Sequence, residues 1–208
     1  RSCLVGSEMC IRDSYTIVNR STLTKYLQKF CRKESNQVTT MEKYTKRLPI
    51  SCSKVFDLSP EGVWEMITAP GNLNATHPFC DTNEALVWDG QNHSDRLVYL
   101  NGRTYVRNFQ TWDENKGYTL LIGEDNGAQS YVVWEIESFG ENKSKLSITV
   151  YPFILAKLPK FLAFIPHLFW VKPRMTAYLN SVLGGFAYFC DTGESVPRNH
   201  FGSHKWFS

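Results

Sequence analysis

Apolar and polar residues alternate loosely along most of the chain between Leu48 and Tyr151. Alternation with a period of two is typical of strands that bury one face in an antiparallel sheet. Short turns join the later strands, so consecutive strands must pair as an antiparallel meander. The Asn101-Gly102 pair is typical of a two-residue type I′ hairpin. The pattern predicts seven strands, at residues 48–58, 85–88, 96–100, 103–112, 118–122, 131–136 and 146–151.

Two short helices are predicted between the first strand and the second. Ser59 is suited to an N-cap and Pro60 to the first position of a helix, and apolar residues three and four apart follow them. The sequence Ala69-Pro70-Gly71-Asn72 ends this helix. A second helical turn around Leu73 ends before His77-Pro78, so both helices precede the meander.

A longer helix is predicted from Arg174 to Cys190. Its apolar residues recur at steps of four and three, on one helical face: Met175, Leu179, Val182, Phe186 and Phe189. A sheet of seven strands must curl, and one amphipathic helix fills only part of its concave face. We therefore expect an α+β helix-grip fold, in which a curved antiparallel sheet of about seven strands surrounds the C-terminal helix and leaves a cavity.

This order of elements resembles the START/Bet v 1-like superfamily, also called SRPBCC. The resemblance extends from about Leu48 to Cys190 and lies in architectural features rather than in a catalytic signature. These features are the start of the first helix at Ser59-Pro60-Glu61-Gly62-Val63-Trp64, the break at Ala69-Pro70-Gly71-Asn72-Leu73, the turn from Trp112 to Gly117, and the terminal helix. The resemblance implies a cavity for a hydrophobic molecule, as in lipid-transport-like proteins and polyketide cyclases.

The chain divides into an arm, a domain and a tail. Residues 1–40 show no sustained period and are expected to be a disordered or artefactual arm. Within it, residues 6–14 resemble read-through from library sequence, which makes Met41 a candidate native start. The ligand-binding domain is expected at residues 48–190, with an apolar insertion at residues 153–171, and residues 191–208 form a C-terminal tail.

The distribution of charge argues against nucleic acid as a partner. The formal net charge is +3, but residues 1–40 hold seven Lys and Arg against three Asp and Glu, so the rest of the chain is nearly neutral. The six cysteines are widely spaced and form no CxxC pair, which favours reduced cysteines in a cytoplasmic protein. Walker A, GxGxxG, GxSxG and HExxH motifs are missing from the sequence, and no cofactor or metal is expected. No pattern specifies an oligomeric state.

Three residues are candidates for chemistry on a ligand. His77 follows the second short helix, at a position that lines the cavity mouth in the superfamily that the chain resembles; a structural role in the turn is the alternative. Tyr105 and Arg107 share one face of a strand with Phe109. If that face points inward, Arg107 anchors a ligand carboxylate or carbonyl. If it points outward, Arg107 pairs with a carboxylate across the strand.

The expected ligand-binding residues lie on the strands of the concave sheet, on the first helix and beyond it, or on the terminal helix. They are Trp64, Phe79, Tyr105, Arg107, Phe109, Trp134, Ile148, Leu179, Val182 and Phe186. On strand 131–136 the choice of face is clear, because Val132, Trp134 and Ile136 alternate with polar residues. Glu135 is therefore expected to face water. The Gly184-Gly185 pair in the terminal helix indicates either close packing or close approach of a ligand.

The insertion at residues 153–171 holds fourteen apolar residues out of nineteen. Pro159 and Pro166 interrupt it, and its lysines argue against a membrane span. Three interpretations remain: a lid over the cavity, a peripheral contact with a bilayer, and a dimer surface. The residues that would act as lid or membrane contact are Phe153, Lys157, Lys160, Phe161, Phe164 and Trp170.

The sequence thus supports three functional hypotheses. The first is a binding or carrier protein for a hydrophobic lipid, isoprenoid or polyketide-like molecule. The second is a cyclase or dehydratase of the polyketide cyclase or aromatase type, in which His77, Tyr105 and Arg107 converge on the ligand. The third is a membrane-associated accessory protein that uses residues 153–171. In the tail, His200 and His204 lack a third metal ligand nearby, so aromatic docking of the tail onto the domain is the expected role.

Overall fold

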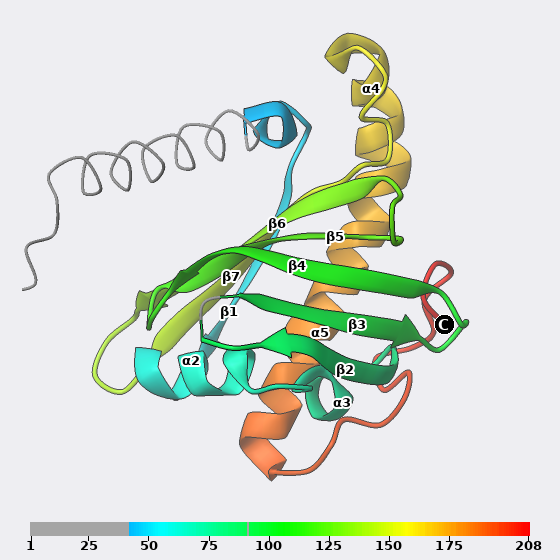
Figure 1. The fold of residues 1–208 in the computed structure, drawn as a ribbon. Helices are drawn as coiled ribbons and strands as arrows, with labels where there is room; N and C mark the ends of the chain where they lie inside the picture. The colour runs from blue at the N-terminus through cyan, green and yellow to red at the C-terminus, as the bar shows by residue number, and fades with distance from the viewer. Residues whose placement is uncertain (1–41, 91) are drawn as a thin grey trace, which may run out of the picture. The chain divides into compact units, whose positions relative to one another are not determined.

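In the part of the chain that the structure describes, seven strands form one sheet, and each is antiparallel to its neighbours (Figure 1). The computed structural model describes residues 42–90 and 92–208. The expectations for residues 1–40 and for Met41 fall outside this part of the chain. The strands are β1 Ile50–Phe56, β2 Cys80–Trp88, β3 His93–Tyr99, β4 Thr104–Asp113, β5 Gly117–Gly123, β6 Gln129–Ser138 and β7 Ser144–Tyr151.

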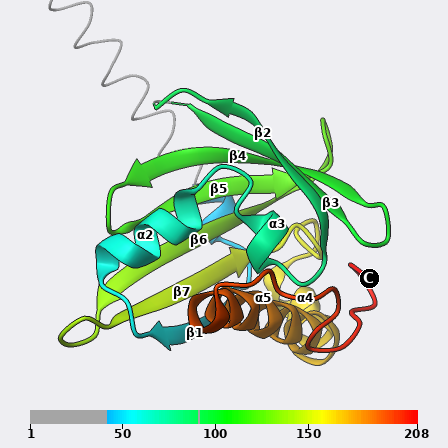
Figure 2. The same ribbon diagram turned by 90° about the horizontal axis from the view of Figure 1, so that it is seen from below.

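The strand order is β1-β7-β6-β5-β4-β3-β2, which confirms the predicted meander of six strands. The first strand, β1, pairs with β7 at one edge, a position that the sequence pattern did not predict. Register shifts occur in β2 and between Phe109 and Thr111 in β4. Such bulges increase the local twist of a sheet. The sheet curls around the helices, which lie on its concave side (Figure 2). The helix-grip architecture expected from the sequence is therefore present.

The β3–β4 hairpin differs from the predicted two-residue turn. A type I′ turn requires positive φ at both central residues, yet of the Asn101-Gly102 pair only Gly102 has it, at +79°. The Tyr99 carbonyl accepts from the Gly102 amide, and the Tyr99 amide donates to the Arg103 carbonyl. The loop is therefore a three-residue connection, Leu100 to Gly102, which moves the register of the two strands by one residue.

Two short helices follow β1 as predicted. Helix α2 spans Pro60–Thr68 and α3 spans Leu73–Thr76. The Ser59 side chain accepts a hydrogen bond from the Gly62 amide, which is the N-cap interaction expected from the sequence. Together α2 and α3 cover the part of the concave face that α5 leaves open (Figure 2).

The C-terminal helical region is longer than predicted. Helix α4 (Lys160–Pro166) runs directly into a π-helical segment η1 (His167–Val171) and then into α5 (Lys172–Thr192). Pro159 stands at the N-cap of α4, but Pro166 does not end the helical run. Instead, the backbone widens to π-type hydrogen bonding just after this proline, with the Lys172 amide donating to the His167 carbonyl.

The glycine pair in α5 serves close packing. A Cβ atom on Gly185 would lie 2.1 Å from the carbonyl oxygen of Thr76 in α3, and one on Gly184 would lie 2.8 Å from the ring of Phe201. The packing partners are thus α3 and the C-terminal tail. On the sheet, Val132, Trp134 and Ile136 are buried and Glu135 is exposed, as the alternation predicted.

Candidate functional site

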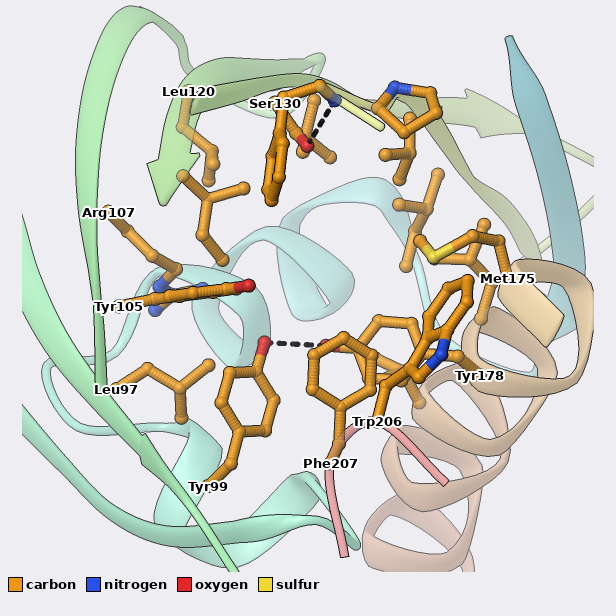
Figure 3. Close-up of a pocket in the computed structure, with 18 of the residues that line it drawn as sticks. Leu97, Tyr99, Tyr105, Arg107, Leu120, Ser130, Met175, Tyr178, Trp206 and Phe207 are labelled. Carbon is orange, nitrogen blue, oxygen red and sulfur yellow. Dashed lines mark hydrogen bonds between the residues drawn. The ribbon is translucent and has the colours of Figure 1, made fainter. Parts of the chain in front are cut away.

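A cavity of about 410 Å³ lies between the concave face of the sheet and α5 (Figure 3). This size is within the range of pockets that bind small molecules. Side chains of the C-terminal tail complete its wall at one end, where Trp206 and Phe207 lie beside α5. The apolar part of the lining includes Leu73, Leu97, Leu120, Ile122, Val132, Trp134, Ile148, Val150, Met175, Leu179 and Val182.

All three candidates for chemistry line this one cavity, namely His77, Tyr105 and Arg107. So do four of the residues expected to contact a ligand: Trp134, Ile148, Leu179 and Val182. Their elements explain this placement, because alternate residues of β4, β6 and β7 and one face of α5 point to the same interior.

Four expected ligand contacts do not line the cavity: Trp64, Phe79, Phe109 and Phe186. They are packed against other aromatic rings, which occupy the space that a ligand would need. The Trp64 ring lies 5.2 Å from that of Trp112, and the Phe109 ring lies 5.0 Å from that of Tyr118. The sequence pattern left the direction of Phe109 open, and it did not show which end of the concave face α2 fills.

Phe79 and Phe186 are also held in the core. The Phe79 ring stacks on Tyr178 at 5.9 Å, and Phe186 meets Trp134 edge-on at 5.6 Å. Both side chains are essentially without solvent exposure. Their contribution to the cavity is therefore indirect, through the rings that they support.

Arg107 combines the two orientations considered for it. It points inward, and it is also paired across the strand with Asp95 of β3. Arg107 Nε donates to Asp95 Oδ1 at 2.7 Å, and Nη2 donates to Oδ2. Burial by itself lowers the pKa of Arg107, but the Asp95 carboxylate raises it above the ordinary value. The guanidinium is thus a buried, neutralised cation rather than a free anchor for a ligand carboxylate.

A chain of hydrogen bonds connects His77, Tyr178 and Tyr99, and we call it the hydroxyl chain. The Phe79 amide donates to His77 Nδ1 at 3.2 Å, and His77 Nε2 lies 3.0 Å from the Tyr178 hydroxyl. That hydroxyl lies 3.1 Å from the hydroxyl of Tyr99 (Figure 3). The chain begins at the backbone beyond α3 and ends on β3, against the cavity.

The protonation of His77 fixes the direction of these bonds. Burial, together with the positive charge of Arg107, lowers the pKa of His77 to about 3, so the ring is neutral at pH 7. Because Nδ1 accepts from the Phe79 amide, the single proton is on Nε2 and is donated to Tyr178.

The hydroxyls of Tyr178 and Tyr99 carry two protons, and the hydrogen bond between them uses only one. Tyr178 and Tyr99 share one hydroxyl proton, and the Tyr178 oxygen already accepts from His77. Burial raises the pKa of both tyrosines above the ordinary value, so both keep their protons. Within the described residues, no further acceptor is hydrogen-bonded to either hydroxyl. One hydroxyl proton is therefore left to donate to a ligand.

Tyr105 adds a second hydroxyl at the same end of the cavity. Figure 3 shows its hydroxyl oxygen directed into the cavity, next to Tyr99. The Tyr99 and Tyr105 rings meet edge-on at 5.6 Å. Burial raises the pKa of Tyr105, which keeps this group a neutral donor as well. The tyrosine hydroxyls of the lining thus lie where β3, β4 and α5 face each other. The lining also includes the polar residues Arg103, Glu124 and Ser130.

Sequence reasoning missed several residues of this wall. Tyr178 lies one helical turn from Met175 and Val182, so a search for polar positions at the edge of the apolar stripe would have found it. Tyr99 shares the inward face of β3 with Leu97. Phe207 stacks on Tyr99 at 4.4 Å, which supports the expected docking of the tail by its aromatic residues. No periodic signal in the tail indicates that it lines the cavity.

The apolar insertion contributes only part of itself to the cavity. Phe153 and Trp170 line it. In contrast, Phe161 and Phe164 on α4 are exposed, as are Lys157 and Lys160. None of the helices in the described ranges is both long enough and apolar enough to cross a bilayer.

No metal centre is built into the described ranges, because no three His, Cys, Asp or Glu side chains there come together as ligands. His204 is used structurally, with Nε2 lying 3.0 Å from the carbonyl oxygen of Arg174. Cys52, Cys80 and Cys190 are free thiols, whereas Cys3, Cys10 and Cys31 lie outside the described residues. Burial raises the pKa of the Cys80 thiol to about 12, so it is not a nucleophile at neutral pH.

Comparison with known proteins relates the chain to others by fold. No family model matches the sequence, and no curated protein matches it. The protein TTHA0849 from Thermus thermophilus is 16% identical with a TM-score of 0.56, over 71% of this chain and all of that one. An uncharacterised protein from Bacillus thuringiensis is 14% identical with a TM-score of 0.51, over 68% of this chain and 97% of that one.

DynU16, a protein in the dynemicin biosynthetic locus, is 15% identical with a TM-score of 0.54. The match covers 71% of this chain and 48% of DynU16, so the chain spans about half of that protein. Likeness at this level of identity establishes the fold alone. The fold and the cavity therefore define the class: a helix-grip protein with an internal, largely apolar pocket.

Proposed function

We propose that the protein binds and carries one apolar small molecule, held by a carbonyl or hydroxyl oxygen at the tyrosine end of the cavity. A lipid, an isoprenoid or a polyketide-like molecule has this chemistry. The observation that carries the proposal is the asymmetry of the cavity, which is apolar along most of its wall and presents neutral hydroxyl donors at one end. Pockets that combine an apolar lining with a few placed polar groups are typical of small-molecule sites.

The polar groups favour an uncharged acceptor over an anion. The hydroxyl chain offers one proton, and Tyr105 offers another. Arg107 does not add a free positive charge, because Asp95 already holds its guanidinium in a two-point bond. A ligand carboxylate beside Arg107 would be brought close to the Asp95 carboxylate, which already balances that cation. Arg103, the other cation of the lining, donates to the Trp206 carbonyl. A carbonyl or hydroxyl oxygen has no such cost.

A cyclase or aromatase acting in the same cavity is the alternative. It requires a general base whose pKa is near the working pH. The pKa of His77 is about 3, its Nδ1 already accepts from the Phe79 amide, and its Nε2 is bonded to Tyr178. These contacts support positioning of a hydroxyl rather than proton transfer. The fold likeness to DynU16 does not distinguish a carrier from a cyclase.

Titration with prodan, an apolar naphthalene fluorophore with one ketone, tests the proposal. We expect saturable binding to the full chain with blue-shifted emission. The substitution Val182→Trp fills the cavity from α5 and should weaken binding by at least about tenfold, since it removes the space that burial requires. As a matched control, Val133→Trp adds the same bulk to the outer face of β6 and should bind as the native chain does. Absent binding, or equal binding by Val182→Trp, contradicts the proposal.

Removal of one hydroxyl tests the polar end separately. Tyr99→Phe keeps the ring that packs on Phe207 but deletes the hydroxyl that ends the chain. Loss of one neutral hydrogen bond costs about 1 kcal/mol, so the prodan Kd should rise about fivefold. The same variant should leave the binding of a naphthalene without a ketone unchanged. Equal losses for both probes would mean that the hydroxyl serves the structure and not the ligand.

A further inference from the structure

Helix α4 and segment η1 expose apolar side chains that a folded domain normally buries. The side chains of Phe161 and Phe169 are 76% and 74% exposed, and the chain offers them no cover within its described residues. The buried residues of this region, Ala163, His167 and Val171, lie four apart on the opposite side. Figure 1 shows α4 projecting past the sheet. We define the α4–η1 patch as Phe161, Leu162, Phe164, Ile165, Leu168 and Phe169.

The charges around the patch have one sign. Between Glu141 and Asp191 the chain contains no acidic residue. The patch is bordered by Lys157 and Lys160 before it and by Lys172 and Arg174 after it. Within residues 42–90 and 92–208, none of these four cations is paired with a carboxylate.

A hollow of about 210 Å³ beside the patch is also basic. Its walls include Lys43, Lys46, Arg47 and Lys160, together with His167 and the apolar residues that follow β7. Arg47 is fixed in place, because its Nη1 donates to the Gln129 carbonyl at 2.7 Å. None of the described residues that line the hollow is a carboxylate. A phosphate group is the ligand that a hollow with several cations suits best.

We propose that the protein docks on a bilayer rich in anionic phospholipid, with the α4–η1 patch in the acyl boundary and lipid phosphates at the basic hollow. An apolar helical face bordered by lysines is typical of interfacial helices, for which apolar burial and attraction to anionic lipid act together. The proposal does not depend on the ligand proposed for the cavity, because the two sites are tested with different probes.

A second copy of the chain fits the patch less well. In a symmetric dimer the same surface meets itself, so the lysines that border one patch would lie near those of the other. Like charges brought together oppose association. An anionic bilayer instead supplies the opposite charge. Trp170 follows the patch residue Phe169 in the chain and lines the cavity. Docking through the patch would therefore place the bilayer near the edge of the ligand site.

Vesicle flotation with the full chain tests the proposal. The probes are vesicles of phosphatidylcholine alone and of phosphatidylcholine with an equal part of phosphatidylglycerol. We expect binding to the anionic vesicles that weakens at high salt, and at least about tenfold less binding to the neutral ones. Binding of the Lys157→Glu/Lys160→Glu variant to anionic vesicles should fall at least about tenfold. The control Lys54→Glu/Lys116→Glu makes the same change of charge at exposed positions elsewhere and should bind nearly as the native chain does.

The apolar contribution needs its own variant. Phe161→Ser/Phe169→Ser should abolish flotation, whereas the control Leu86→Ser/Phe139→Ser, at exposed apolar positions away from the patch, should not. Circular dichroism confirms that each variant is folded. Equal flotation of the two lysine variants, or equal flotation on neutral and anionic vesicles, overturns the proposal. A native dimer that Phe161→Ser/Phe169→Ser makes monomeric, without any vesicle binding by the native chain, also overturns it and assigns the patch to self-association.

Discussion

The polar end of the cavity and the α4–η1 patch depart in opposite ways from the usual distribution of side chains: the first buries polar groups, and the second exposes apolar ones. Asp95, Arg107 and His77 are at most 4% exposed, although each bears a strongly polar group. Phe161 and Phe169 are about three-quarters exposed, although each is fully apolar. Buried polar groups and large exposed apolar patches are the informative departures from the rule that apolar residues lie inside.

The difference between the two regions is that one is satisfied within the chain and the other is not. Among the described residues, every buried side-chain nitrogen and oxygen atom has a hydrogen-bond partner. The buried groups of the polar end are thus held in fixed positions by partners within the chain, and one proton of the hydroxyl chain is left for a ligand. The α4–η1 patch has no such partner in the part of the chain that the structure describes. The buried polar groups therefore indicate a preorganised site, and the exposed apolar patch indicates a missing partner.

The largest effect is expected at the buried ion pair. The substitution Asp95→Asn leaves the Arg107 cation in the interior without its counter-charge. Removing one partner of a buried pair costs about 3–5 kcal/mol, so the free energy of unfolding should fall by that amount. Guanidinium unfolding followed by tryptophan fluorescence measures it.

The matched control replaces both partners. Asp95→Leu/Arg107→Met removes the two charges together, and it should be much less destabilised than Asp95→Asn, because no uncompensated charge remains. A double variant that is as unstable as the single one would mean that packing, and not the charge, holds this part of the cavity together.

A smaller change in the free energy of unfolding is expected from the protonation of His77 at low pH. Its pKa is about 3 in the folded protein and about 6.5 in the unfolded chain, so the unfolded state binds more protons between these values. Stability should therefore be complete above pH 6.5 and decline as the pH falls toward 3. Between pH 6.5 and 4 the loss due to this residue is about 3 kcal/mol.

The comparison with His77→Gln isolates this contribution. A glutamine cannot take up the proton, so the variant should lose about 3 kcal/mol less than the native protein over the same interval. Urea unfolding at several pH values gives both curves. Parallel curves would show that the pKa of His77 is the same in the folded and unfolded states, so that the folded protein does not keep this ring neutral as the pH falls.

The sequence predicted the framework better than the site, and the reason is visible at one hairpin. The number of strands, their order along the chain and the Ser59 N-cap depend on local pattern and were correctly predicted. The starts of two strands were not, because β2 begins at Cys80 rather than at residue 85 and β3 at His93 rather than at residue 96. A two-residue turn at Asn101-Gly102 would have set Arg107 opposite Arg96. The three-residue turn sets it opposite Asp95 instead, which creates the buried pair. One residue of loop length thus decides the chemistry of the cavity, and local pattern does not report it.

The remaining site residues were missed because they depend on contacts far apart in the chain. Phe207 and Tyr99 are over one hundred residues apart and stack at 4.4 Å. Trp64 and Phe109 were expected to contact the ligand, but they pack against Trp112 and Tyr118 instead. How the concave face is divided between α2 and the cavity depends on three-dimensional packing, which periodicity does not encode.

The smallest change in the free energy of unfolding is expected for substitutions in the α4–η1 patch. This small change would distinguish the exposed patch from the buried polar end. Phe161→Ser/Phe169→Ser changes side chains that are about three-quarters exposed and make little contact with the core. Surface substitutions away from special features usually alter the free energy of unfolding by less than about 0.5 kcal/mol. We therefore expect unfolding curves that nearly coincide with those of the native protein, measured in guanidinium without vesicles. If the free energy of unfolding fell by more than about 2 kcal/mol, the patch would be covered by the chain itself, as in a lid. The patch would then have its partner within the chain, as the polar end does.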